Sequence, residues 1–581
     1  MRLAQQIPVL STFARYGVLI ATVACASAPS SPSEPTPRPT TRAALANRPK
    51  KLEEITAAYQ SAGLSERQAA TILLQRFTYG ARPDDLAHVL EKGLVAWFAD
   101  QLAGTATEAA LDAKLAPLSS LALDDAELMY SYPSFSATIA HAKRYYPEVL
   151  AGTENAVDFN VTAAKIGEFA KAHDLHRMQD GLIPHLYAQK VLRAVYSDNQ
   201  LREVMTQFWQ NHFYVTTTHF GAQGWVMSFE RDVLRPHAVG RFQDLLQGSV
   251  RHPAVLETFM REAQPVDSAT PTLMAMRFAT LQRERPAQAA QAKAATEAAV
   301  AQVESEYDLI LKKEFWAPAG PNPMFAETIL RQYTLGPQTK LADGTVQNVA
   351  GLLTGWTVFP YGPDARWFAV DLEPTEPLGF KREGSFWFRA DQHDAGDKHI
   401  FDHDYAGQDG LRAGEQLLED LALRPETAHH LASKLVQHFV GQDVPAALVA
   451  AVAQAFQRSQ GDIKAMLTAL VTSPEFYQVA ADQPLSKTPL HYVASAARST
   501  DADIEDASAL VERIATMGQP LYGFLESTGY PQDQTYFLDA GAMLSRIHFA
   551  ADLQNQAVPG VQVPKHEALA LHLASPEFQQ Y

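Results

Sequence analysis

Apolar residues that recur at every fourth position are the dominant pattern of the chain after residue 55. The stretch that follows Pro425 is typical, because Leu431, Leu435 and Phe439 fall four apart in it. This spacing aligns side chains on one face of an α-helix. Pro425 itself suits a first helical turn, where its missing N–H is not needed. Strand patterns are scarce, so we expect a mainly α fold: a large multi-helix body with little strand.

Two short motifs support this prediction because each is a typical helix start. Ser473-Pro474-Glu475-Phe476 and Ser575-Pro576-Glu577-Phe578 both place a serine at the N-cap, a proline after it and an acidic residue in the first turn. Residues 284–313 are rich in Ala, Gln and Glu, which have high helix propensity. We expect a long exposed helix there, bounded at its start by Pro286.

An irregular, aromatic-rich region separates the helical stretches between positions 358 and 412. Its best strand signal is Ser385-Phe-Trp-Phe-Arg-Ala390, because aromatic residues are favoured in strands. We therefore expect one helical domain over residues 56–581 that contains a long irregular loop region. A division of this domain into two lobes near 415–420 is an alternative.

The first 25 residues resemble a bacterial lipoprotein signal peptide. Arg2 and Arg15 supply positive charge, a short apolar run ends at Ala24, and the only cysteine of the chain, Cys25, follows directly. The run is too short for a membrane-spanning helix, which needs about 20 apolar residues. We expect Cys25 to be lipidated and to hold the protein in the cell envelope, at the outer membrane or in the periplasm. Plain secretory cleavage beside Cys25 is the alternative.

Residues 26–55 are expected to form an extended tether. Their first half consists largely of Pro, Ser and Thr, a composition that buries little apolar area and stays extended. Such a tether after a lipidated cysteine would hold a globular body away from a membrane.

The charge of the chain argues against nucleic acid as a partner. The chain has 48 basic and 65 acidic residues, a net charge of −17 over 581 residues, which is a poor electrostatic match for a polyphosphate. A hydrophobic fraction of 46% with 19% charged residues is ordinary for a globular protein, so wholesale disorder is excluded as well.

Standard catalytic motifs are missing, and polar clusters inside apolar stretches are the remaining candidates. The first cluster is Phe208-Trp209-Gln210-Asn211-His212-Phe213. Its amide and imidazole would be costly to bury without partners. His212 is a candidate base or ligand that Asn211 would orient. The alternative is that both side chains only cap neighbouring backbone at a helix end.

Arg231 and His252 form a second pair of candidates. Arg231 could bind a carboxylate or sulfate of a substrate, and a core ion pair with an acidic residue is the alternative. His252 stands directly before Pro253, a position from which histidine often caps a helix.

The richest cluster is the loop 391–404, in which eight His and Asp side chains fall within 14 positions. Mixed sets of imidazole and carboxylate ligands bind Zn, Mn or Ca. No fixed ligand spacing is present, so a solvated acidic loop is the alternative, and neither a metal nor another cofactor is assigned.

These clusters, in this order, resemble the bacterial family called domain of unknown function 1800, over nearly all of residues 70–581. The matching stretches are Leu74-Gln-Arg-Phe-Thr-Tyr-Gly80, Gly93-Leu-Val-Ala-Trp97, Phe208-Trp-Gln-Asn-His-Phe213, Arg231, His252-Pro253-Ala254, Thr334-Leu-Gly336, Leu353-Thr-Gly-Trp-Thr357, His393-Asp394 with Lys398, Gly518-Gln519 and Ser575-Pro-Glu-Phe-Gln579. The resemblance implies a largely helical, exported protein, often found beside a second exported family related to sulfatases. It implies no established reaction.

The chain departs from the pattern of this family at several acidic positions. Glu327 and Thr328 stand where the family has Arg and Glu, and Arg331 and Tyr333 replace a usual Glu and His. The usual Asp, Glu and Arg before the Thr-Gly-Trp motif are replaced as well, by Thr345, Asn348 and Gly351. Acid–base chemistry that needs those carboxylates would be impaired. Either the retained polar residues form the site, or this member has lost activity.

We therefore carry two hypotheses for function. The first is a hydrolase or lyase that acts on an extracellular polymer such as a polysaccharide. Its catalytic residues would be Asn211, His212, His393 and Asp394, and its substrate-binding residues Arg231, His252, Trp209 and Trp356. The second is a non-catalytic surface protein that binds a polymer or a second exported protein of the sulfatase-related type. The enzyme hypothesis predicts that Asn211, His212, Arg231, His252, His393 and Asp394 share one pocket.

Overall fold

A computed structural model of the chain describes residues 51–151, 159–259, 263–264, 267–310, 320–359, 373–565 and 568–581. The predicted signal peptide with Cys25, and the predicted tether as far as residue 50, lie outside these residues. The chain from Pro49 to Tyr581 forms one compact unit. Helix α20 (Leu411–Leu423) runs without interruption across 415–420, where the two-lobe alternative puts its boundary.

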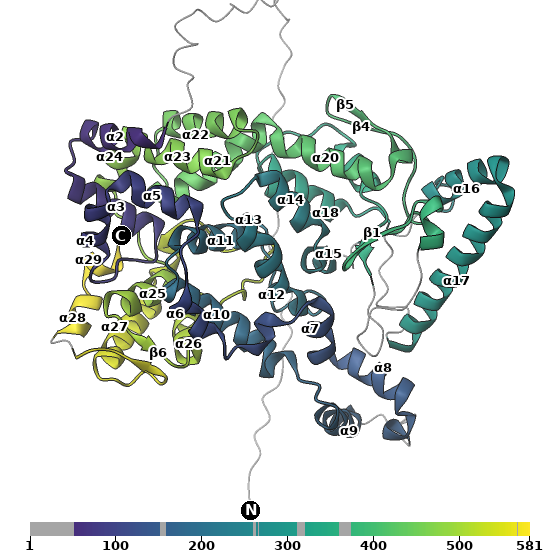
Figure 1. Cartoon of the computed structure of the whole chain (residues 1–581), viewed down its shortest axis with the longest axis horizontal. Coiled ribbons are helices and arrows are strands. Elements are labelled where there is room, and N and C mark those ends of the chain that lie inside the picture. Colours follow the sequence, from purple (N-terminus) through teal and green to yellow (C-terminus); the bar gives the residue numbers. More distant parts are fainter. Residues whose placement is uncertain are drawn as a thin grey trace, which may run out of the picture. The chain divides into compact units, whose positions relative to one another are not determined.

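Helices account for most of the described residues, which confirms the mainly α prediction (Figure 1). The first part of the unit contains α2 (Ile55–Ser61), α3 (Glu66–Phe77), α4 (Asp85–Lys92), α5 (Leu94–Ala103), α6 (Ala109–Leu115), α7 (Asp125–Ser131), α8 (Phe135–Tyr145), α9 (Phe159–Ala172), α10 (Leu182–Tyr196), α11 (Gln200–His212), α12 (Val226–Ser228), α13 (Arg235–His237), α14 (Phe242–Arg251) and α15 (Pro253–Phe259). The second part contains α16 (Leu273–Glu284), α17 (Pro286–Ile310), α18 (Pro323–Glu327), α19 (Thr345–Leu352), α20, α21 (Pro425–Val440), α22 (Ala446–Arg458), α23 (Ile463–Val471), α24 (Pro474–Asp482), α25 (Pro489–Ser499), α26 (Ser508–Thr516), α27 (Ala540–Gln554), α28 (Leu569–Leu573) and α29 (Pro576–Gln579).

Helix α21 shows how the sequence produces these elements. It begins with Pro425 in its first turn and ends at Gly441, whose φ of 130° suits glycine far better than other residues. Its apolar residues at four-residue spacing, Leu431, Leu435 and Phe439, are all buried. They pack α21 into the core beside α22, which is followed by α23, and Figure 1 shows the three helices side by side.

The other predicted helix starts are also present in the structure. The two Ser-Pro-Glu-Phe motifs begin α24 and α29, and the Ser575 hydroxyl accepts a hydrogen bond from the N–H of Phe578. Helix α17 starts at Pro286, as expected. It packs against α16 and α8.

Strands are few and short within the described residues. β1 (Trp356–Val358), β2 (Lys381–Glu383) and β3 (Phe386–Phe388) form an antiparallel sheet in the order β1-β3-β2, with Thr357 opposite Trp387. Two two-stranded ladders complete the set: β4 (Lys398–Ile400) with β5 (His403–Tyr405), and β6 (Asp503–Ile504) with β7 (Val561–Gln562). The predicted strand over 385–390 is therefore β3, and the loop region between the helices contains two of these sheets.

Aromatic packing brings the end of α3 against α21, although the two helices are far apart in the sequence. The ring of Phe77 stacks on that of Phe439, with 4.5 Å between the ring centroids, and it also contacts Phe476 of α24. Helix α3 contacts α11 as well, and α11 and α25 both pack against α10. Together these contacts place the end of α3, the middle of α11, one face of α21 and the start of α25 around a common space.

Candidate active site

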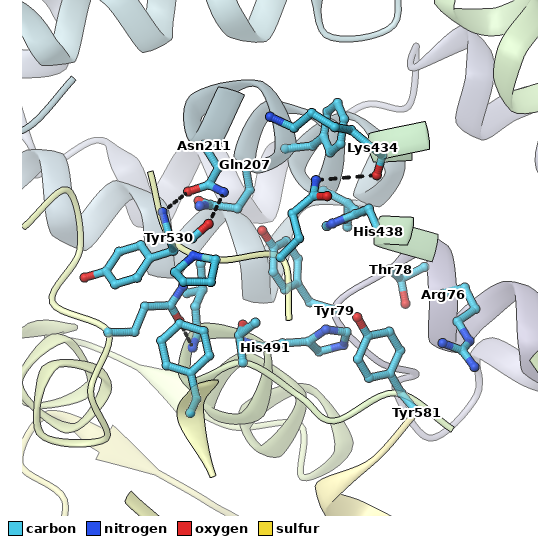
Figure 2. A pocket seen from close by; sticks show the side chains of 18 residues that line it. Arg76, Thr78, Tyr79, Gln207, Asn211, Lys434, His438, His491, Tyr530 and Tyr581 are labelled. Carbon is cyan, nitrogen blue, oxygen red and sulfur yellow. Dashed lines mark hydrogen bonds between the residues drawn. The ribbon is translucent and has the colours of Figure 1, made fainter. Parts of the chain in front are cut away.

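A cavity opens where the end of α3, α11, one face of α21 and the start of α25 meet the segment that follows α26 (Figure 2). It contains about 810 Å³ of space, its open mouth included. Its walls are formed by Arg76, Thr78, Tyr79, Val204, Gln207, Phe208, Asn211, Lys434, His438, Thr488, Leu490, His491, Gln519, Tyr530, Pro531, Gln532, Phe537 and Tyr581.

Basic side chains line this cavity without any matching acid. Arg76, Lys434, His438 and His491 contribute nitrogen atoms, and no aspartate or glutamate of the described residues is part of the wall. The chain as a whole carries a net charge of −17, so the basic lining runs against the overall charge. A cavity walled by one sign of charge attracts ligands of the opposite sign, so this one is suited to an anion.

Arg76, near the end of α3, offers a hydrogen-bond donor with no partner. Its Nη2 donates to the carbonyl oxygens of Gln483 at 2.7 Å and Ala480 at 3.3 Å. Its Nη1 is buried and has no hydrogen-bond partner among the described residues. Burial lowers the pKa of Arg76 to about 10, so the guanidinium stays charged at neutral pH. Because an unpaired buried donor is costly, this group is ready to bind an anionic ligand.

One face of α21 presents His430, Lys434 and His438 at intervals of four residues, so that they lie in a row. Burial lowers the pKa of Lys434 to about 8. Burial, and next the charge of Lys434, lower the pKa of His438 to about 4. At neutral pH, Lys434 is therefore mainly a proton donor and His438 a neutral proton acceptor. The imidazole of His438 hydrogen-bonds to none of the described residues, which leaves it free for a ligand.

His212 lies behind the cavity wall and contacts Lys434. Its side chain is fully buried. Its Nδ1 accepts a hydrogen bond from Lys434 Nζ at 3.0 Å, and its Nε2 lies 3.1 Å from the carbonyl oxygen of Tyr333. These partners require a neutral imidazole that carries its proton on Nε2. Burial, followed by Lys434 and His430, accordingly holds the pKa of His212 well below its usual value.

Asn211 fixes the opposite side of the cavity. Its Nδ2 donates to the carbonyl oxygen of Tyr530 at 2.8 Å, and its Oδ1 accepts from the N–H of Tyr530 at 2.7 Å (Figure 2). The neighbouring Gly529 has φ of +73°, and a Cβ there would lie 2.5 Å from the Asn211 carbonyl oxygen. The amide of Asn211 therefore holds the wall residue Tyr530 at a close approach that only glycine permits.

His491, in the first turn of α25, contributes a second neutral imidazole. Its Nε2 is buried without a hydrogen-bond partner in the described parts of the chain. Its ring packs against Tyr79 and Tyr581, with centroid separations of 5.6 and 4.2 Å. Burial, followed by the nearby Lys487 and His438, holds the pKa of His491 well below its usual value.

The other predicted site residues on the helices have internal partners. Trp209 is buried and donates from Nε1 to the Ala238 carbonyl oxygen at 2.8 Å. His252 caps α15, because its Nδ1 accepts from the N–H of Ala254 at 3.1 Å. Burial, and next the charge of Arg231, lower the pKa of His252 to about 3. Arg231 forms an ion pair with Asp232 at 2.7 Å and donates to main-chain carbonyls that precede α7.

The predicted loop residues stabilise the loop itself. The two ring nitrogens of the fully buried His393 lie 2.8 and 3.0 Å from the carbonyl oxygens of Thr354 and Gly407. Asp394 forms an ion pair with Lys398 at 2.9 Å. Trp356 is buried in β1 and lines a different, smaller cavity between α15 and α19. No group of three His, Cys, Asp or Glu side chains in the described regions is arranged to hold a metal ion.

The six residues that were expected to share one pocket therefore lie at different places in the structure. Asn211 lines the cavity, and His212 reaches it through Lys434. Arg231 lines a separate surface cavity with Arg235 and Lys464. His252, His393 and Asp394 are held by the contacts described above and are not part of the cavity wall.

Two departures from the family pattern form a pair in the structure. Glu327 and Arg331 are four residues apart on one face of the helical segment, and Arg331 Nε lies 2.9 Å from Glu327 Oε1. The resemblance places Arg and Glu at these positions in the reverse order. Neither residue is part of the cavity wall, so these two departures leave the wall unchanged.

Sequence reasoning missed Arg76, Lys434, His438 and His491. Arg76 stands inside Leu74–Gly80, one of the stretches that carry the family resemblance, and Gln519 in another such stretch also lines the cavity. Lys434 and His438 were detectable as a second row at four-residue spacing, one position before Leu435 and Phe439. No local signal distinguishes His491, which becomes a wall residue only through the packing of α25.

Comparison with known proteins identifies the family. A family model described as "Protein of unknown function (DUF1800)" matches residues 72–580. No curated protein and no solved structure matches the chain. Within the described residues, no helix combines the length and apolar character that a membrane crossing requires. Because the match covers nearly the whole chain, the protein belongs to the DUF1800 family.

Proposed function

We propose that this protein is an exported lyase that cleaves an anionic extracellular polysaccharide, a polyuronate, by β-elimination in the cavity beside Lys434 and His438. The observation that carries the proposal is the basic wall, which contains no aspartate or glutamate side chain among the described residues. Elimination from a uronate needs a cation for the carboxylate, a base for the proton on the adjacent carbon and an acid for the departing oxygen. The cavity offers a side chain for each task.

In this mechanism Arg76 binds the uronate carboxylate through its unpaired Nη1. The neutral imidazole of His438 takes the proton from the carbon next to the carboxylate. The electrons of that C–H bond form a carbon–carbon double bond as the bond to the leaving oxygen breaks. The Lys434 ammonium group gives its proton to that oxygen, so the reaction needs neither water nor an oxidant.

Hydrolysis of a glycosidic bond fits the same cavity less well. The usual mechanism uses two carboxyl groups on either side of the bond, one as acid and the other as base or nucleophile. The described residues of the wall contain no carboxyl side chain. Of the two reactions that the sequence leaves open, lyase chemistry is therefore the better supported.

The proposed lyase would act at the cell envelope. Cys25 would carry the lipid, and the Pro/Ser/Thr-rich segment after it would serve as a tether. The second exported protein that the family resemblance implies, of the sulfatase-related type, would be a partner on the same anionic polymer. Because the chain as a whole carries a negative net charge, an anionic polymer would be attracted to the basic cavity and not to the surface in general.

A second candidate is a protein that binds the same anionic polymer without cleaving it. The internal contacts of His393, Asp394 and Arg231 favour it, because these retained polar residues have structural partners in place of a substrate. In this case Arg76 and Lys434 would still bind the anionic group, but His438 would have no reaction to assist.

The proposal is tested by incubating the purified protein with a polyuronate and with a neutral glucan, while recording the ultraviolet absorbance of the unsaturated product. Product from the polyuronate alone is expected. Replacing His438 by Gln should lower the rate by about 100-fold or more, the usual contribution of a general base. His429→Gln is the matched control, because His429 is an exposed neighbour on the same helix, and it should retain full activity.

Binding of the polyuronate in a sedimentation assay, without absorbance, would replace the lyase by the second candidate. Neither binding nor product with any polyuronate would contradict both. Equal rates for the His438→Gln and His429→Gln variants would show that the reaction takes place elsewhere in the protein.

A further inference from the structure

A second cavity adjoins the first, and Tyr581 contributes to the walls of both. It contains about 720 Å³ of space, its opening included, and lies between α3, α25 and the C-terminal helices. Its polar lining includes Lys487, Ser495 and Ser499. None of these residues has a role in the proposed lyase reaction.

Lys487 and Ser495 form a direct hydrogen bond in this cavity. Lys487 Nζ lies 2.7 Å from Ser495 Oγ. The two residues are only 6% and 2% exposed, so this is a buried contact and not a transient one between surface side chains. The amine also lies over the ring of Phe578, whose centroid is 3.8 Å away. No carboxylate of the described residues forms an ion pair with Lys487.

The backbone of Lys487 is fixed on both sides, which positions its side chain along α25. Its N–H donates to the Gln579 carbonyl oxygen at 2.9 Å, and its carbonyl oxygen accepts from Arg546 Nη2 at 2.7 Å. Thr488 and Pro489 then cap and start α25. Ser495 lies within that helix, at a position that the Lys487 side chain reaches.

Burial, followed by the charge of Arg546, lowers the pKa of Lys487 to about 7. A large fraction of the amine is therefore unprotonated at neutral pH. An unprotonated amine in hydrogen-bond contact with a hydroxyl accepts its proton, which is the way that a serine is activated as a nucleophile.

Glycine at position 80 lets the backbone pack closely against Ser495. Gly80 has φ of +98°, and a Cβ at this position would lie 3.1 Å from Ser495 Cβ and 3.2 Å from Ser495 Oγ. Any side chain there would crowd the hydroxyl. The next residue, Ala81, also lines the cavity, and its N–H hydrogen-bonds to none of the described residues.

We propose that Ser495 and Lys487 form a second catalytic centre, a Ser–Lys dyad that hydrolyses esters of short carboxylic acids. The apolar part of the wall, Leu74, Ala81, Leu86 and Phe578, suits a short acyl chain rather than a charged one. The centre uses residues distinct from those of the lyase and does not depend on that function.

The reaction proceeds in two balanced steps. Ser495 Oγ bonds to the acyl carbon as its proton passes to Lys487 Nζ. The bond from the acyl carbon to the alcohol oxygen then breaks, and Lys487 returns the proton to that oxygen. In the second step Lys487 takes a proton from water, the resulting hydroxide displaces Ser495 Oγ from the acyl group, and the serine regains its proton.

The direct test is labelling of the full-length protein with a fluorophosphonate, which reacts with activated serines, and mapping of the adduct by mass spectrometry. The adduct is expected on Ser495. Hydrolysis of a chromogenic acetate ester should be abolished in Ser495→Ala and lowered by about 100-fold or more in Lys487→Met, the usual contribution of a general base. Ser499→Ala is the matched control, since Ser499 lines the same cavity one turn later but donates to the Ala496 carbonyl oxygen.

Two results would overturn the proposal. One is the absence of an adduct on Ser495 in the unaltered protein, a measurement that does not depend on whether any variant folds. The other is an ester hydrolysis rate that is the same in Ser495→Ala and Ser499→Ala. In either case Lys487 and Ser495 would form only a structural contact between α25 and the C-terminal segment.

Discussion

Lys434 Nζ donates a hydrogen bond to His212 Nδ1 at 3.0 Å, and this pair joins the most prominent polar motif of the sequence to the cavity. Because the other ring nitrogen of His212 faces the Tyr333 carbonyl oxygen, His212 acts as a neutral acceptor that holds Lys434 in place. His212 thus positions the side chain of Lys434, and Lys434 is the member of the pair that lines the cavity.

We predict that Lys434 titrates near pH 8, because burial lowers its pKa to about that value. An exposed lysine titrates near about 10.4. The measurement is pH-dependent acetylation read by mass spectrometry, with the exposed Lys340 as the internal reference. A reactivity midpoint for Lys434 at the same pH as for Lys340 would contradict the environment described for it.

We also predict that acid destabilises the protein between pH 6.5 and 4, through histidines that are buried in their neutral form. The pKa of His252 falls to about 3 in the folded state, whereas the unfolded chain takes up a proton near pH 6.5. The unfolded state therefore binds more protons in this interval, and stability falls as the pH falls. Each such histidine contributes at most about 1.4 kcal/mol per pH unit.

Thermal unfolding at several pH values tests this prediction with His252→Asn. Asparagine keeps an acceptor for the N–H of Ala254 but does not titrate, and it is a favoured N-cap residue. The melting temperature of the variant should fall less steeply with acid than that of the parent. Identical slopes would mean that His252 is not buried in its neutral form.

How far the sequence predicts this structure is clearest in α21. The spacing of Leu431, Leu435 and Phe439 predicts the helix and its buried face correctly. The row of His430, Lys434 and His438 beside it looks like an ordinary solvent-facing surface in the sequence. Lys434 and His438 line a cavity because α3 and α25, which come from distant parts of the chain, complete its wall. Local sequence pattern carries no information about such packing.

His212 and His393 illustrate a different limit. Sequence reasoning rightly expects a polar group among aromatic residues to have partners when it is buried. It does not tell whether the partner is a ligand, a side chain or main-chain carbonyls. The ring nitrogens of His393 face the carbonyl oxygens of Thr354 and Gly407, and His212 contacts Lys434 and Tyr333. Both histidines are therefore buried polar groups with partners, as expected. The cavity itself is lined by other residues, among them Lys434 and His438.

A further prediction concerns Asn211, which makes two hydrogen bonds to the backbone of Tyr530. Asn211→Ala leaves these groups without a protein partner and should lower stability by about 1–3 kcal/mol. It should also weaken polymer binding, because Tyr530 is part of the cavity wall. Asn348→Ala, which removes a single hydrogen bond far from the wall, is the control. Equal losses of stability in both variants would contradict the role given to Asn211.

We expect Cys25→Ala to release the protein from the membrane fraction of a bacterial host, because the only cysteine of the chain follows the apolar run directly. Cell fractionation followed by immunoblotting measures this. A variant that remains in the membrane fraction as fully as the parent would show that lipidation of Cys25 is not the anchor.

The central claim is that the basic cavity cleaves a polyuronate by elimination, and the masses of the products test it most directly. A defined uronate oligosaccharide is treated with the purified protein, and the fragments are weighed by mass spectrometry. The account predicts fragment pairs whose masses add up to that of the parent, with one unsaturated end in each pair. Fragment pairs that together exceed the parent by one water, or a parent that stays intact although it is bound, would contradict the account.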